Sequence, residues 1–134
     1  MIIMIFLLQI NKNSSKAESI ESEMDFLVYK GNQAIRLSQN DIAYVLTSEK
    51  STILVDTSGQ QFLINTSLKT LENSLQPDVF FRLNRQIISN RKSIVSFEKL
   101  DTRKLKIMLS TDPGFPIYVS KSNASNFQNW LMRK

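Results

Sequence analysis

Short apolar runs separated by polar turn sequences fill the chain from residue 26 onward, and this pattern constrains the fold more than any other feature. The runs are five to seven residues long and rich in β-branched and aromatic residues, as β-strands are. Glycine, asparagine, aspartate and proline mark the turns between runs, at residues 31–32, 58–59, 101–102 and 112–114. Strands joined by such tight turns pair with their neighbours, so we expect mostly antiparallel sheet.

A different periodicity near the middle of the chain predicts a helix. In the sequence TSLKTLENSL, Leu68, Leu71 and Leu75 are spaced i, i+3 and i+7 and would share one helical face. Thr66 is the expected N-cap, because its hydroxyl can accept a hydrogen bond from an amide of the first turn. The expected packing residues of a short C-terminal helix are Phe127, Trp130 and Leu131. The predicted fold class is therefore mostly β (α+β), with compact antiparallel strands, a central helix and a short C-terminal helix.

Residues 1–24 differ in composition from the rest of the chain. The sequence MIIMIFLL is much shorter than the roughly 20 residues of a membrane-spanning helix, and it lacks the cationic start of a signal peptide. It could form a buried strand or turn, end an upstream segment, or touch a membrane weakly. We favour the upstream segment, because a polar, linker-like sequence follows at once. The predicted organisation is an apolar stretch and linker over 1–24 and one domain over 25–134.

Absent residue types narrow the chemistry that the chain can perform. The 134 residues include no cysteine and no histidine, which removes thiolate nucleophiles, disulfides and the commonest general base and metal ligand. The sequence also contains no glycine-rich phosphate loop and no metal-ligand spacing. We therefore expect no enzyme activity, cofactor, metal or small-molecule substrate. The lack of cysteine is compatible with a cytoplasmic location.

Positive charge is concentrated in one region. The formal net charge is +5, and residues 82–106 contain eight Lys and Arg against two carboxylates, so this segment carries +6 and the remainder −1. A localised positive field attracts polyanions, which here means nucleic acid or an anionic membrane surface.

Residues 80–97, FFRLNRQIISNRKSIVSF, combine strand-like apolar residues with four cations and no carboxylate. Arg82 alternates with apolar neighbours, so it could simply lie on the solvent face of a strand and pair with a carboxylate from elsewhere. Asn90 is expected to cap a turn by bonding to its own backbone. The remaining cations are available for a partner.

The order of elements and the motif at residues 80–90 resemble the LytTR DNA-binding domain, the output domain of many bacterial response regulators. The motif FFRLNRQIISN is similar to the family block F-x-R-x-H-R-S-x-I/L-V-N, and the sequence YVSKS follows near the end. The resemblance covers roughly residues 26–132. This chain has Asn84 where the family most often has histidine, which we interpret as an altered base or phosphate preference.

The resemblance implies three loops that enter successive major grooves on one DNA face, at residues 49–52, 84–86 and 120–122. Arginine can read guanine through two hydrogen bonds and asparagine can read adenine, whereas lysine mainly neutralises phosphates. The predicted base-reading residues are Arg85, Lys121, Asn84 and Thr52. The predicted phosphate contacts are Lys50, Gln86, Arg91, Lys92 and Ser122, although Arg91 and Lys92 could equally be solvated charge.

The predicted function is sequence-specific binding of double-stranded DNA by a bacterial transcriptional regulator of a two-component system. The resemblance also implies direct-repeat sites, a dimer on them, and an upstream receiver or sensor. The alternative is a basic β-domain that binds an anionic membrane surface or an acidic protein, with the apolar N-terminal stretch as its main support.

Overall fold

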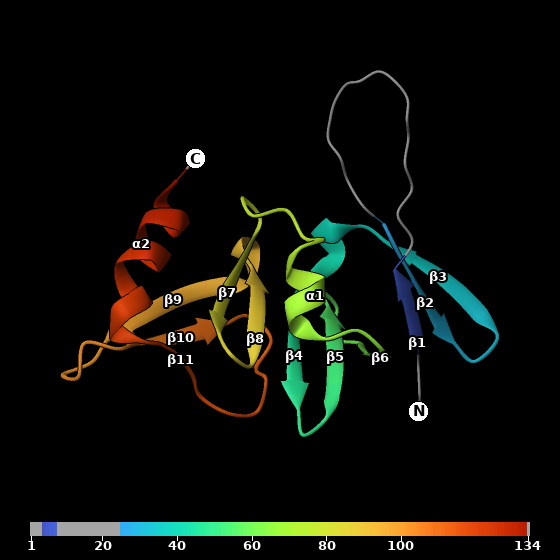
Figure 1. Cartoon of the computed structure of the whole chain (residues 1–134), viewed down its shortest axis with the longest axis horizontal. Helices are drawn as coiled ribbons and strands as arrows, with labels where there is room; N and C mark the ends of the chain where they lie inside the picture. The colour runs from blue at the N-terminus through green and yellow to red at the C-terminus, as the bar shows by residue number, and fades with distance from the viewer. Residues whose placement is uncertain (1–3, 8–24, 134) are drawn as a thin grey trace, which may run out of the picture.

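Two β-sheets and two α-helices make up the computed structural model, which describes residues 4–7 and 25–133 (Figure 1). The large sheet has eight strands in the order β3-β2-β1-β6-β5-β4-β8-β7, and every pairing except that of β1 with β6 is antiparallel. Its strands are β1 (Met4–Leu7), β2 (Phe26–Lys30), β3 (Gln33–Leu37), β4 (Ile42–Ser48), β5 (Ser51–Asp56), β6 (Gln61–Ile64), β7 (Phe80–Asn84) and β8 (Ile87–Asn90).

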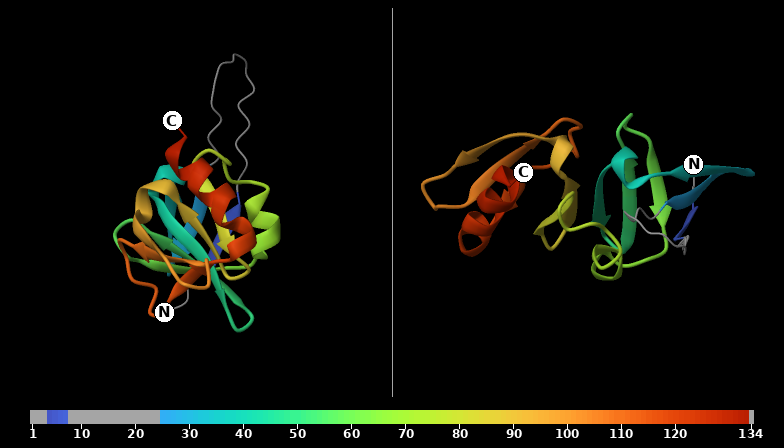
Figure 2. Two further views of the ribbon diagram at one scale, coloured as in Figure 1. Left: turned by 90° about the vertical axis from the view of Figure 1, so that its left-hand side faces the viewer. Right: turned by 90° about the horizontal axis from the view of Figure 1, so that it is seen from above.

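The small sheet follows in the chain and is antiparallel throughout, in the order β11-β10-β9. Its strands are β9 (Ile94–Lys99), β10 (Leu105–Leu109) and β11 (Ile117–Val119). The helices are α1 (Leu68–Glu72) and α2 (Ala124–Met132), with short 3-10 turns η2 (Gln39–Asp41), η3 (Arg91–Ser93) and η4 (Lys121–Asn123). Figure 2 shows the small sheet and α2 at one end of the molecule and the β2–β3 hairpin at the other. The predicted class, antiparallel β with a central and a C-terminal helix, is confirmed.

Strand β4 lies between two hydrophobic cores, which explains why its sequence is apolar without interruption. Ile42 and Val45 join the first core, in which the buried leucines of α1 cover one face of the large sheet. Tyr44 and Leu46 join the second core, in which the small sheet and α2 cover the opposite face. Both faces of the strand are therefore buried, a pattern more usual for strands of parallel sheets.

Helix α1 begins one residue later than predicted. Leu68, Leu71 and Leu75 are all buried, as their spacing indicates. The N-cap is Ser67 and not Thr66, because the Ser67 hydroxyl accepts the hydrogen bond from the Thr70 amide at 3.1 Å. Serine is a somewhat better N-cap than threonine, so cap propensity also favours Ser67 over Thr66.

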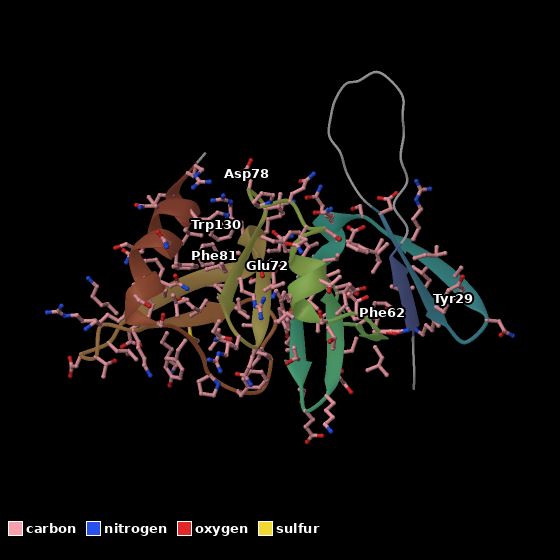
Figure 3. All side chains as sticks on the ribbon, viewed as in Figure 1. Tyr29, Phe62, Glu72, Asp78, Phe81 and Trp130 are labelled. Carbon is pink, nitrogen blue, oxygen red and sulfur yellow. The ribbon has the colours of Figure 1, made fainter. Side chains whose placement is uncertain are left out.

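Helix α2 is held by aromatic packing and by hydrogen bonds at its C-terminal end. The ring of Phe81 on β7 lies 5.1 Å from the ring of Trp130 (Figure 3). It lies 5.6 Å from the ring of Phe127. The Trp130 indole also donates to the Pro77 carbonyl at 2.8 Å. The predicted packing roles of Phe127 and Trp130 are confirmed, since both side chains are buried.

The N-terminal stretch is where the structure differs from the predicted organisation. Strand β1 pairs with β2 on one side and with β6 on the other, so it belongs to the large sheet and is not separate from the domain. Its apolar sequence includes Ile5 and Phe6, residue types that favour strands, and its backbone pairs with two strands that are not neighbours of each other. The polar linker predicted at residues 11–23 lies outside the described residues.

Candidate nucleic-acid interface

Three loops lie along one side of the molecule, the lower side in Figure 1. They are the tip of the β4–β5 hairpin, the β7–β8 turn, and the segment from the end of β11 into α2. These are the three loops that the sequence predicts to contact DNA. A nucleic-acid duplex is a long partner, and it can contact all three loops at once because they lie on one surface.

Two hydrogen bonds tie these loops to one another. The Thr47 amide, near the end of β4, donates to the Gln86 carbonyl in the β7–β8 turn at 2.9 Å. The Asn84 side-chain amide, on the other side of this turn, donates to the Tyr118 carbonyl of β11 at 2.8 Å. The β7–β8 turn is therefore connected to the strands that carry the loops on either side of it.

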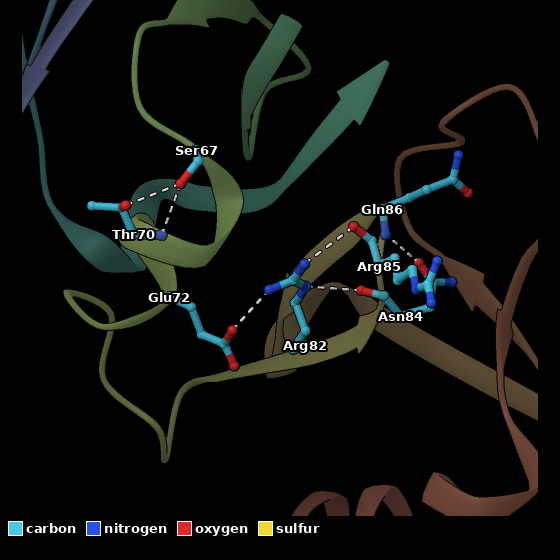
Figure 4. A network of polar contacts seen from close by, with 7 residues as sticks. All are labelled: Ser67, Thr70, Glu72, Arg82, Asn84, Arg85 and Gln86. Atoms are coloured by element: carbon cyan, nitrogen blue, oxygen red, sulfur yellow. Dashed lines mark hydrogen bonds and ion pairs between the residues drawn. The ribbon is translucent and has the colours of Figure 1, made fainter. Parts of the chain in front are cut away.

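Arg85 lies at the apex of the β7–β8 turn and is exposed. Its guanidinium forms no ion pair within the described part of the chain. The Asn84 side-chain oxygen accepts a hydrogen bond from the Gln86 amide at 2.7 Å, which closes the turn beneath it (Figure 4). The backbone of the turn is therefore well defined, and the Arg85 guanidinium at its apex is free to bind a partner.

Asn84 itself is occupied by the fold. Its oxygen binds Gln86 and its nitrogen binds Tyr118, so both ends of the side chain already have partners. Each end keeps one further N–H or lone pair, but the two bonds fix the orientation of the side chain against the turn. These bonds favour a role for Asn84 in holding the turn in place, and its predicted base-reading role stays a prediction.

The first loop contains one exposed candidate and one buried candidate. Lys50 is exposed at the hairpin tip, beside Glu49, whose φ of 56° is the left-handed value that a tight turn requires. Thr52 is only 8% exposed and pairs with Thr47 and Ile64 inside the sheet. This burial argues against base reading by Thr52. An open hollow of about 470 Å³ lies between this hairpin and residues 64–68.

The third loop presents Lys121 and Ser122 from the 3-10 turn η4, and both side chains are exposed. The Ser122 hydroxyl lies 3.2 Å from that of Ser120, the N-cap of this turn. Lys121 forms no ion pair with any residue of 4–7 or 25–133. Both predicted candidates in this loop are thus accessible.

Arg91 and Lys92 lie elsewhere. They follow β8, whereas the β7–β8 turn precedes it, so about 13 Å of strand separates them from the turn. The Arg91 guanidinium donates to the carbonyls of Trp130, Leu131 and Asp78 at 2.6 to 2.8 Å. It also lies 4.4 Å from the centre of the Trp130 ring, a cation–π geometry. These contacts favour a structural role for Arg91 over its predicted contact with phosphate.

The structural interpretation of Arg82 and Asn90 is supported. Arg82 forms an ion pair with Glu72 of α1 at 2.8 Å. Asn90 is fully buried, where it accepts from the Lys92 amide and donates to the Ile42 carbonyl. Only two of the four cations in residues 80–97, Arg85 and Lys92, thus remain without such partners in the described structure.

The described part of the chain carries several cations without an ion-pair partner. Several Lys and Arg side chains form no ion pair with another described residue: Lys50, Arg85, Lys92, Lys99, Arg103, Lys104, Lys106 and Lys121. No group of three acidic residues that could hold a metal ion occurs among residues 4–7 and 25–133. No described helix is long and apolar enough to cross a membrane.

Comparisons with known proteins match the chain to DNA-binding domains. The family model described as the LytTr DNA-binding domain matches residues 32–132. A solved structure, the LytTr DNA-binding domain of a protein described as a methyl-accepting/DNA response regulator from Bacillus cereus, is similar with a TM-score of 0.65. It is 24% identical in sequence, and the similarity covers 84% of this chain and 99% of that one. A comparison with curated proteins finds no match.

Proposed function

This chain belongs to the LytTR family of DNA-binding domains, and from this we propose that it binds double-stranded DNA in a sequence-specific manner as part of a bacterial transcriptional regulator. The observation that carries the proposal is the free Arg85 guanidinium at the apex of the β7–β8 turn, with exposed cationic loops on both sides. An exposed arginine on a well-defined turn suits the edge of a guanine, to which it can donate two parallel hydrogen bonds.

Base reading is assigned to Arg85 first and to Lys121 second. The phosphate contacts are assigned to Lys50, Gln86 and Ser122, which are exposed on the same three loops. Phosphate contacts fix the position of the protein along the duplex, and base contacts select the sequence. The three loops together would therefore read successive segments of one DNA face through the major groove.

Assembly on DNA follows from the size of the domain and from its family. A single domain offers one arginine reader, so two copies on a direct repeat would double the sequence that is read. We propose that an upstream receiver or sensor brings the copies together and that the protein acts in the cytoplasm, where chromosomal DNA lies.

Selection from a randomised duplex library at near-physiological salt tests this function. We expect enrichment of a short motif, repeated about one helical turn apart, which is about 10 to 10.5 base pairs. Retention of duplexes without any enriched motif would contradict sequence-specific binding and leave only attraction between charges.

The membrane alternative loses its main support, because residues 4–7 form a strand of the large sheet. Flotation with anionic vesicles, compared with neutral vesicles, checks it directly. Binding to anionic vesicles together with a failed duplex selection would favour a general basic surface over a DNA reader.

A further inference from the structure

We propose that Arg82 and Glu72 form a positioning pair that sets the conformation of the β7–β8 turn and so aims Arg85 at its base. This inference rests on the proposed function, since it concerns how the base reader is held. Neither residue needs to touch DNA. Both act through the backbone of the turn.

The three contacts of the Arg82 guanidinium carry the inference (Figure 4). Its Nε donates to the Asn84 carbonyl at 2.8 Å, and its Nη2 donates to the Arg85 carbonyl at 3.2 Å. Its Nη1 bonds to the Glu72 carboxylate at 2.8 Å. One planar group therefore holds two consecutive carbonyls of the turn and connects them to α1.

Hydrogen bonds hold each residue of the turn, residues 84–86, but none of them involves the Arg85 side chain. The Gln86 carbonyl accepts from the Thr47 amide, and the Asn84 side chain is fixed by Gln86 and Tyr118. The carbonyls of Asn84 and Arg85 are the part of the turn that Arg82 holds. Without Arg82 they would face water, and the peptide that carries Arg85 would gain freedom to rotate.

A bulge in β7 brings Arg82 within reach. Arg82 pairs with Ile88 and Asn84 with Ile87, so Leu83 is the extra residue on β7. Such a bulge bends its strand and redirects the neighbouring side chains. Leu83 is fully buried in the second core, which anchors the bent strand.

Helix α1 provides a firm base for the carboxylate. Leu68 and Leu71 are buried beneath the sheet, and Ser67 caps the first turn through the Thr70 amide. Glu72 follows directly on this anchored turn and is half-exposed, so its carboxylate can reach Arg82 without being buried. Because the pair is partly exposed, it adds little to global stability. Its effect should therefore be seen in the turn and not in the fold.

Arginine is required for this role. A lysine ammonium is a compact charge on a flexible stem and has no planar fork to address two carbonyls and a carboxylate at once. Holding a binding loop in its bound conformation before contact reduces the entropy lost on binding, and mispositioned readers lose selectivity.

The test measures affinity for the selected duplex and for a scrambled duplex of equal length, with the full chain at one salt concentration. The variants are Arg82→Gln, Arg82→Lys, Glu72→Gln and Arg85→Ala, together with the double variant Arg82→Gln/Arg85→Ala. Arg36→Gln is the matched control, because Arg36 forms an equally short ion pair, 2.8 Å to Asp25, on the distant β2–β3 hairpin. Amide NMR of the free proteins reports the mobility of residues 84–86 independently of DNA.

We expect Arg82→Gln to reduce discrimination between the duplexes about tenfold, the size of one lost base contact. Arg82→Lys should fail to restore it, Glu72→Gln should cause a smaller loss, and Arg36→Gln should cause none. The double variant should discriminate no worse than Arg85→Ala alone. The amides of Asn84 and Arg85 should become more mobile in Arg82→Gln, with the rest of the spectrum preserved.

Three outcomes would overturn the inference. Equal losses on both duplexes would make Arg82 a phosphate contact, and additive losses in the double variant would make it independent of Arg85. Unchanged mobility of the turn would mean that Arg82 does not hold it. If Arg82→Gln does not fold, Glu72→Gln decides between the same outcomes. If the unaltered protein does not discriminate at all, it is the proposed function that fails, and the NMR comparison alone decides whether Arg82 orders the turn.

Discussion

Arg82 and Arg85 are three positions apart and have opposite environments. Arg82 uses its guanidinium inside the molecule, on Glu72 and two carbonyls, whereas the Arg85 guanidinium faces solvent without an ion pair among the described residues. The first therefore contributes to the shape of the turn and the second to what the turn can bind. A charge count treats the two as equivalent, but the chemistry they can perform differs.

Replacement of Arg85 by alanine should relax base selection at one position of the DNA site. Loss of two hydrogen bonds to one base costs about 1–3 kcal/mol on the selected duplex and little on a scrambled one. Competition binding with single-base variants of the site measures this. Equal weakening on both duplexes would contradict the assignment of Arg85 as a base reader.

Tyr44 predicts a pH effect on stability. The residue is 2% exposed, and burial raises the pKa of its hydroxyl above the ordinary value of 10.0, with a further rise from the Asp112 carboxylate. Because the pKa is raised in the folded protein, the unfolded chain releases this proton at a lower pH than the folded chain does. The free energy of unfolding should therefore fall as the pH rises above about 10 and through the folded pKa.

Tyr44→Phe removes the group that titrates and keeps the ring. Urea unfolding between about pH 8 and about pH 11 should show a smaller alkaline loss for the variant than for the unaltered protein. If the free energy of unfolding falls equally with pH in both proteins over this range, Tyr44 does not contribute to the alkaline loss.

Residues that point outward are easier to predict from the sequence than residues that bond to the interior. The sequence predicts loop positions for Arg85, Lys121, Lys50, Gln86 and Ser122, and all five are exposed. The binding of Arg91 to the end of α2 and the contact of Asn84 with Tyr118 are not predictable in this way, because these contacts join residues 34 to 40 positions apart. Only the spacing of Arg82, Asn84 and Arg85 around a turn could have hinted at the positioning contacts.

At the scale of elements, Arg91 joins three segments. It follows β8, and its guanidinium binds the last carbonyls of α2 together with the Asp78 carbonyl before β7. Cations near the C-terminal end of a helix also complement its dipole. Arg91 therefore adds to the aromatic packing that docks the last helix.

Arg91→Gln should destabilise the protein by about 3 kcal/mol, because charged hydrogen bonds to partly buried carbonyls are lost together. Urea unfolding followed by Trp130 fluorescence suits the measurement, since Trp130 is the only tryptophan and lies at the contact. Lys92→Gln is the control, because Lys92 is exposed on the same 3-10 turn and should change stability little. Equal effects of the two changes would contradict the docking role.

Local patterns predicted the elements well but not their neighbours. The leucine spacing identified α1, and the glycine-containing turns identified the β2–β3 and β5–β6 hairpins, where Gly31 and Gly59 have positive φ. The division into two sheets and the place of β1 between β2 and β6 depend on pairing between distant segments. Such pairing leaves little trace in local periodicity.

At the scale of the whole molecule, positive charge is uneven along the chain, with eight Lys and Arg against two carboxylates in residues 82–106. Affinity for any duplex should fall steeply with added salt, because each neutralised phosphate releases counterions.

Lys50→Ala should lower the slope of log K against log salt by about 0.9, equally for selected and scrambled duplexes. Titrations at several salt concentrations measure the slope. Lys30→Ala on the β2–β3 hairpin serves as the control and should leave the slope unchanged. A loss of selectivity in Lys50→Ala would instead indicate that Lys50 reads bases.

Strand β4 has one face in each core, and this has a consequence for how the domain unfolds. A cavity or a buried polar atom on either side of this strand weakens the packing on which the other side also depends. The two sheets should consequently melt in one cooperative step, and partly folded forms that retain half of the domain should be scarce. Damage to the core would then reduce the number of working molecules in a population and leave each surviving molecule with its full selectivity.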